Sequence, residues 1–124
     1  MAVSAEYLAY AQEQMGLVSG ILARRMFGGV GFSVRGRMFA LLADDVLYLK
    51  TDDSNRSEFE AAGMGPFVPF AEKRTQTMPY YEVPAEVLED RTELAAWVRK
   101  AIVVAYRAAA AKKRPAKKTV GKKK

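Results

Sequence analysis

Two turn signals divide the stretch from Arg24 to Lys50 into three apolar runs. Arg35-Gly36 separates the first run from the second, and Asp44-Asp45 separates the second from the third. Glycine tolerates a positive φ and aspartate hydrogen-bonds its own backbone, so such pairs between apolar runs are typical of tight hairpin turns. The stretch therefore predicts a three-stranded antiparallel meander.

Helical patterns flank the meander on both sides. Residues 4–15 have apolar residues at helical spacing, with Ser4 as the expected N-cap. After the meander, Asp52 or Asp53 is the expected cap of a short helix that runs through Ala62. Gly63 then suits the left-handed position at the end of that helix.

The last part of the body predicts two strands and a long helix. Residues 67–70 and 77–83 have strand patterns, and their prolines indicate edge or bulged strands. Pro84 suits the start of a helical turn, and residues 90–93 resemble a capping box with aspartate in first position. The helix that follows carries an apolar stripe. Its members Leu94, Trp97 and Ala101 are expected to pack on the sheet against Phe39, Leu41, Leu47 and Leu49.

The resulting order is helix, three strands, helix, two strands, helix. This order predicts an α+β fold with two layers and an antiparallel sheet of about five strands. The chain has 124 residues, of which half are hydrophobic, and this suits one domain with a modest core. We assign the domain to residues 1–111 and a separate tail to residues 112–124.

The tail carries a charge that the body does not share. Eight of the 20 Lys and Arg residues lie in the tail, and all 14 Asp and Glu residues lie before it. The body therefore has twelve basic against fourteen acidic residues, a net charge of −2, whereas the tail carries +8. A segment of Lys, Ala, Pro and Gly without aromatic residues cannot build a core, so the tail is predicted to be disordered.

Dense positive charge on such a segment suits the phosphate backbone of DNA or RNA, which it would bind without reading sequence. The other interpretation is a solubility tail with no dedicated partner. The candidate nucleic-acid-binding residues are Lys112, Lys113, Arg114, Lys117, Lys118, Lys122, Lys123 and Lys124.

Composition narrows the chemistry that the chain can perform. The chain contains no Cys and no His, so it has no thiolate nucleophile and lacks the commonest general base and metal ligand. We therefore expect no enzymatic activity, no cofactor and no metal site. The N-terminal stretch has no basic region leading into an apolar run, and no apolar run is long enough to span a bilayer. The expected location is the cytoplasm.

The glycine-rich piece at residues 27–32 could be a nucleotide-binding loop. It is followed by another strand rather than by a helix N-terminus, which phosphate-binding loops require. The favoured interpretation is a bulged strand, in which Gly28, Gly29 or Gly31 holds a backbone conformation that is costly for other residues or lies against another backbone.

Other charged groups have simpler local explanations than a site. Asp44-Asp45 and Asp52-Asp53 suit a turn and a helix cap, and neither pair belongs to a metal-ligand array. Arg24-Arg25 would point to opposite faces of a strand, and Arg35 and Arg37 straddle a turn, so ordinary surface charge is expected.

Aromatic residues suggest one possible interface. Tyr80 and Tyr81 are adjacent on a predicted strand, so one is expected in the core while the other could form an exposed patch with Phe32 or Phe27. A patch on this strand or on the first strand could mediate a homodimer, the commonest symmetric assembly.

Several blocks of the sequence resemble the N-terminal domain of the TfoX/Sxy family of competence regulators. The similar blocks occur in the family's order: RMFGG at 25–29, MFAL at 38–41, ADD at 43–45, LYLK at 47–50 and MPYYEVP at 78–84. The resemblance implies the same order of elements as the residues predict, and a small domain able to self-associate. It implies no nucleotide site at the glycines.

Together these observations predict a non-enzymatic regulatory or interaction domain with a basic tail for non-specific nucleic-acid binding. The alternative is a protein-binding adaptor whose tail only keeps it soluble. A small-molecule binder or enzyme is disfavoured by the missing His and Cys. The protein partner and the regulated process are open at this point.

Overall fold

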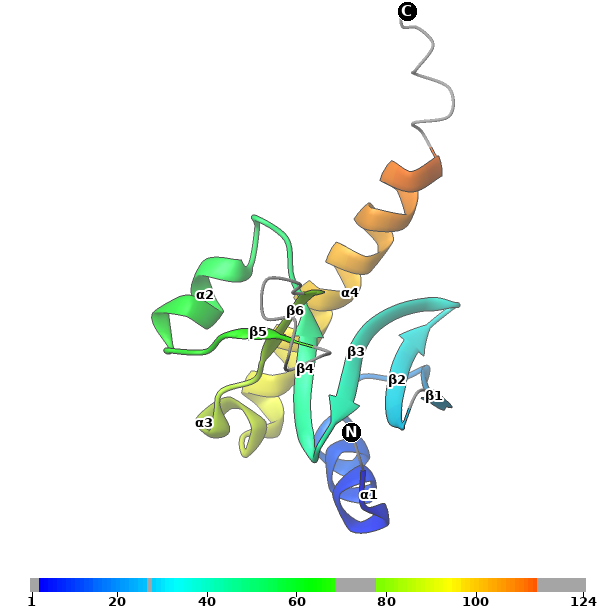
Figure 1. Cartoon of the computed structure of the whole chain (residues 1–124), viewed down its shortest axis with the longest axis vertical. Coiled ribbons are helices and arrows are strands. Elements are labelled where there is room, and N and C mark those ends of the chain that lie inside the picture. Colours follow the sequence, from blue (N-terminus) through cyan, green and yellow to red (C-terminus); the bar gives the residue numbers. More distant parts are fainter. Residues whose placement is uncertain (1–2, 27, 69–77, 114–124) are drawn as a thin grey trace, which may run out of the picture.

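The computed structural model describes residues 3–26, 28–68 and 78–113, and it shows an α+β fold built on one antiparallel sheet (Figure 1). Six strands pair in the order β1-β2-β3-β4-β6-β5. The prediction of an antiparallel α+β fold is confirmed, and five strands was one too few. The elements are α1 (Ala5–Gln14), β1 (Ile21–Met26), β2 (Gly29–Val34), β3 (Arg37–Ala43), β4 (Val46–Lys50), α2 (Arg56–Ala61), β5 (Pro66–Phe67), β6 (Met78–Glu82), α3 (Ala85–Leu88) and α4 (Arg91–Lys113).

The predicted first strand is in fact two strands. β1 and β2 pair from Ile21↔Val34 to Met26↔Gly29, and Gly28 lies in the turn between the two strands. Gly28 has a φ of 79°, a value that glycine adopts without steric cost. Gly28 therefore holds the backbone conformation expected of these glycines, but it does so in a hairpin turn and not in a bulge. This turn was missed because the apolar residues around the glycines continue without a polar interruption.

The two turn signals that the sequence did show are confirmed. Arg35 and Gly36 have φ values of 52° and 80°, and Asp44 and Asp45 have φ values of 52° and 56°. Positive φ at both central residues is the geometry of a type I′ turn, which matches the twist of the flanking strands. Asp45 also joins the turn to the first helix, since its Oδ1 accepts the Ser4 N–H at 2.9 Å.

The helix ends follow the capping signals in most places. Ser4 Oγ accepts the Tyr7 N–H at 3.1 Å, and Asp90 Oδ1 accepts the N–H groups of Thr92 and Glu93. Gly63 follows α2 with a φ of 82°, as expected.

The predicted cap of α2 was wrong. Its N-cap residue is Asn55, whose side chain makes no capping bond to the helix. Asn55 instead bridges the loop before the helix, because it accepts from the Asp52 N–H and donates to the Lys50 carbonyl. Of the aspartates, Asp52 accepts from Ser54, and Asp53 pairs with Arg56.

The main core lies between the sheet and the helices. α4 crosses one face of the sheet and packs on β3 and β4, while α1 lies across one end (Figure 1). A register shift between β2 and β3 leaves Phe39 without a partner, since Phe32 pairs with Ala40 and Ser33 with Met38. This bulge lets Phe39 and Ala40 join the same core. The buried core residues include Phe32, Phe39, Leu42, Leu47, Leu49, Phe59, Leu94, Val98 and Ala101.

Two expected core contacts need correction. Leu41 does not face α4. It belongs to a smaller cluster on the other face of the sheet, with Phe67 and Tyr80 and with Tyr48 alongside. Trp97 is half-buried at the margin of the main core, where its ring meets Phe59 edge-on at a centroid distance of 4.8 Å.

Leu94 provides a test of the helix–sheet core. Its side chain is 0% exposed, whereas Leu22 on β1 is 66% exposed. We expect Leu94→Ala to lower the free energy of unfolding by about 2–5 kcal/mol, because a buried cavity replaces the side chain. Leu22→Ala is the matched control and should change stability by less than about 0.5 kcal/mol. Urea unfolding measures both, and equal losses would contradict the assignment of the core.

Candidate interaction surfaces

The C-terminal basic residues begin on the last turn of α4. The helix ends at Lys113, so Lys112 and Lys113 continue it. Arg114, Lys117, Lys118, Lys122, Lys123 and Lys124 lie outside the described residues. Figure 1 shows the last turns of α4 projecting past the end of the sheet, away from α1. The structure therefore presents the start of the basic segment at one end of the domain.

Polar contacts hold the projecting part of α4 to the body. Arg107 donates to Asp52 Oδ2 at 2.8 Å and to Ser54 Oγ at 3.2 Å. One residue earlier, the Tyr106 ring lies under the Arg37 guanidinium, whose carbon is 5.2 Å from the ring centroid. Lys100 pairs with Glu58 of α2. These contacts link α4 to the segment between β4 and α2 and to the start of β3.

These contacts lower the pKa of the Asp52 carboxylate. Burial alone would raise its pKa, but hydrogen bonds from Ser54 and the charge of Arg107 outweigh burial, so the pKa lies below its ordinary value. A lowered folded-state pKa means that the carboxylate stabilises the fold above the unfolded pKa. The contribution is lost as pH falls through the folded-state value.

The Asp52–Arg107 pair predicts a pH-dependent effect. Asp52→Asn should lower stability at pH 7 by at most about 1 kcal/mol, because the pair is partly exposed. The difference from the unchanged protein should disappear below the folded-state pKa, where Asp52 is protonated in both states. Melting temperatures from neutral to strongly acidic pH measure this. Glu89→Gln is the control, because Glu89 is exposed and makes no ion pair among the described residues. A difference for Asp52→Asn that persists in acid would contradict the pairing.

The glycines of the first hairpin serve packing. A Cβ on Gly29 would lie 2.5 Å from the Leu42 carbonyl oxygen, and one on Gly31 would lie 2.8 Å from Met38 Sδ. The expected close backbone approach is thus confirmed at Gly29. The segment continues into β2 and not into a helix, so it lacks the helix end that holds phosphate in nucleotide loops.

Substitution of Gly29 separates packing from ligand binding. Gly29→Ala should destabilise the fold by about 1–3 kcal/mol, because the new methyl group overlaps a backbone oxygen that cannot move freely. Gly65→Ala is the control, since Gly65 has open space around its Cβ position and should tolerate alanine. Thermal unfolding measures both variants. A stable Gly29→Ala protein that has lost binding of a nucleotide would overturn this interpretation.

The acidic pairs have local partners. Asp44-Asp45 forms the β3–β4 turn, and Asp52 and Asp53 are bound as described above. Within residues 3–26, 28–68 and 78–113, no group of three or more Asp and Glu side chains is arranged to hold a metal ion.

Burial raises the pKa of three tyrosines, Tyr7, Tyr48 and Tyr80. It raises the pKa of Tyr80 to about 12, and it raises the pKa of Tyr7 and Tyr48 with a smaller contribution from Glu82. These phenols are therefore neutral at physiological pH and are poor general bases.

The expected exposed aromatic patch is not present as predicted. Phe32 is fully buried, and Tyr80 is the core member of its pair. Tyr81 packs near Phe59 and donates to Glu60, so it is occupied within the domain. Phe27 lies outside the described residues. Exposed aliphatic side chains occur elsewhere, most prominently Leu22 on β1.

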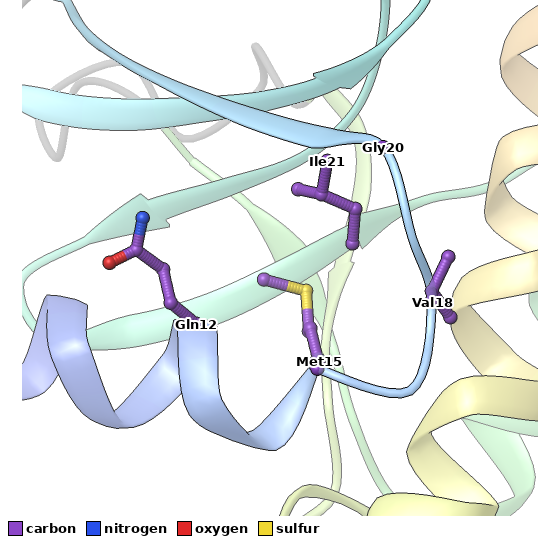
Figure 2. A pocket seen from close by; sticks show the side chains of 6 residues that line it. Gln12, Met15, Val18, Gly20 and Ile21 are labelled. Atoms are coloured by element: carbon purple, nitrogen blue, oxygen red, sulfur yellow. The ribbon is translucent and has the colours of Figure 1, made fainter.

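A small pocket opens between α1 and the start of β1 (Figure 2). Its volume is about 180 Å³, which is below the roughly 300–1,000 Å³ of typical small-molecule sites. Figure 2 shows Ile21 and Met15 approaching one another, with Gln12 beside them. The lining residues are Gln12, Met15, Gly16, Val18, Gly20 and Ile21, none of which titrates. No sequence pattern indicated this pocket, because its residues come from the end of α1, the connecting loop and the first residue of β1.

These features define a small α+β domain. The TfoX N-terminal domain family matches residues 13–105, which is well over half of the chain. The chain therefore belongs to the TfoX N-terminal domain family. No curated protein matches the chain. Among the described residues, no helix is both long and apolar enough to cross a membrane.

Proposed function

We propose that this protein is a non-enzymatic regulatory domain of the TfoX N-terminal type that contacts nucleic acid through its C-terminal basic residues. The separation of charge supports this proposal most directly. Residues 112–124 carry +8 without one acidic residue, whereas the rest of the chain has a net charge of −2. A phosphate backbone would be attracted to that end of the molecule and weakly repelled by the remainder.

The chemistry of the domain supports a binding role. The chain has neither His nor Cys, and the pocket beside α1 is lined by side chains that exchange no proton at neutral pH. The tyrosines with altered pKa values are shifted toward the neutral form. Reactive groups poised for acid–base catalysis usually show the opposite combination, a cleft with titratable groups shifted toward neutral pH.

This mode of binding does not depend on the base sequence of the nucleic acid. Each lysine that neutralises a phosphate releases condensed counterions, so affinity comes from charge density and falls steeply with salt. Because α4 continues through Lys113, the basic segment begins on the last turns of this helix, which project past the sheet (Figure 1). We place this activity in the cytoplasm.

A protein-binding adaptor is the second candidate function. It is favoured by the exposed Leu22 on the outer strand of the sheet, since exposed aliphatic groups at a strand edge suit protein contacts. The homodimer expected from the first strand or from the Tyr80-Tyr81 strand remains a prediction.

The salt dependence of DNA binding tests the nucleic-acid proposal. With roughly 6–8 phosphates neutralised, the log–log slope of affinity against salt on duplex DNA should be about −5 to −7. Replacing the eight basic residues of 112–124 with glutamine should abolish binding at unchanged length. The melting temperature should change little. Fluorescence anisotropy with two unrelated DNA sequences gives the slope and tests sequence preference.

Arg99→Gln is a control, because Arg99 is an exposed cation of α4 outside the tail. It should leave the slope nearly unchanged. If the glutamine variant binds DNA as well as the unchanged protein, a folded surface is responsible and the tail proposal is wrong.

A further inference from the structure

β1 is a long open edge of the sheet. The strand order places β1 at one edge, and the other edge is β5, which has two residues and begins with Pro66. Among the described residues, none pairs with the outer side of β1. An unpaired edge of six residues offers a row of backbone donors and acceptors to another strand.

The hairpin register shows which backbone groups face outward. Met26 and Gly29 close a two-residue turn, so they form a hydrogen-bonded pair, and bonding alternates along an antiparallel ladder. Leu22, Arg24 and Met26 therefore bond to β2. Ile21, Ala23 and Arg25 direct their N–H and C=O groups away from the sheet.

The part of the chain that includes β1, β2 and β3 carries only positive charge. Residues 16–43 contain four arginines, at positions 24, 25, 35 and 37, and no acidic residue. Arg24 and Arg25 are exposed in the middle of β1. An incoming segment at this edge would therefore be favoured if it carried negative charge.

The arrangement of the two arginines suits a peptide strand better than a phosphate backbone. Arg25 pairs across the hairpin with Val30 on the helix-covered face, whereas Arg24 pairs with Gly31 on the opposite face. Successive side chains of a strand also alternate between the two faces. Two consecutive acidic residues on a paired strand would each meet one arginine.

A second copy of this chain fits the edge less well. Antiparallel pairing of β1 with itself, centred on Ala23, would place the Arg24 side chains of both copies at diagonal positions on one face. Such neighbours lie within reach of each other, and like charges there are unfavourable. Each copy would also bring its own four arginines to the interface.

Apolar contacts continue from the arginines toward the start of β1. Leu22 follows on the face of Arg24 and is 66% exposed. Ile21 lies on the face of Arg25 and also lines the pocket beside Met15 and Gln12 (Figure 2). The pocket could take one aliphatic side chain from a strand that runs along β1.

We propose that β1 is a docking edge for an extended acidic segment of a partner protein, which adds an antiparallel strand to the sheet. Read from its N-terminus, the segment has an acidic residue opposite Arg25 and another opposite Arg24. A free position then follows opposite Ala23, with apolar residues opposite Leu22 and Ile21. This surface is independent of the nucleic-acid role proposed for residues 112–124.

The test uses the isotope-labelled full chain and a short capped peptide with the core Glu-Glu-Thr-Val-Leu. Hydrogen exchange measured by NMR should slow for the outward amides of Ile21, Ala23 and Arg25. The amides of Leu22 and Arg24 should change little, because they already bond to β2. A scrambled peptide keeps the charge, so it controls for attraction to the lysines of the tail.

The affinity of the same peptide for variants of β1 provides a second test. Arg24→Glu and Arg25→Glu should each weaken binding by roughly three- to tenfold at low salt. Arg99→Glu on α4 makes the same charge change elsewhere and should leave the affinity near that of the unchanged protein. Ala23→Pro removes one outward N–H that β2 does not use. It should abolish binding while the remaining NMR spectrum stays folded.

Three results would overturn the proposal. Equal affinity for the designed and scrambled peptides would show attraction to charge alone. Protection without the alternation between odd and even positions of β1 would exclude strand addition. A dimer of the free protein that Ala23→Pro dissociates would assign the edge to a second copy.

Discussion

Burial of one sheet face under α4 is the interaction on which the rest of the structure depends. Leu94, Val98 and Ala101 of this helix are fully buried in a core that also holds apolar residues from β2, β3 and β4. The core requires Phe39 and Ala40 to contribute together, although they are neighbours on one strand. The β3 bulge makes this possible, because it breaks the alternation of faces at that point. The same face fixes the direction of α4 and so the place where the basic C-terminal segment begins.

The charges of the chain are segregated into three regions. Residues 112–124 are uniformly basic, the β1–β3 region carries only arginines, and the acidic residues lie outside both. Internal pairs such as Arg107–Asp52 and Arg91–Glu13 use some of these charges to join elements. Such exposed pairs contribute little stability individually. They join α4 to neighbouring elements, and the uniformly basic regions are the surfaces that we propose for polyanions and acidic strands.

The sequence predicted local features well wherever a residue acts on its own backbone. The caps at Ser4 and Asp90, the type I′ turns at Arg35-Gly36 and Asp44-Asp45, and the left-handed Gly63 all follow from such local chemistry. It failed where the outcome depends on distant residues. The Gly28 turn lies within an apolar run, Asn55 bonds Lys50 rather than its helix, and the bulge at Phe39 moved Leu41 to the second face.

The sequence by itself determined most of the elements, their order and the separation of charge, because these depend on residue type and local spacing; the division of the first strand into β1 and β2 was the exception. Family membership, supported by the match to residues 13–105, also rests on sequence. Only the tertiary structure decided which strand edge is open, which face each arginine occupies and that a pocket lies beside Ile21. Those properties depend on strand order and register, which are set by long-range packing of the whole sheet against its helices.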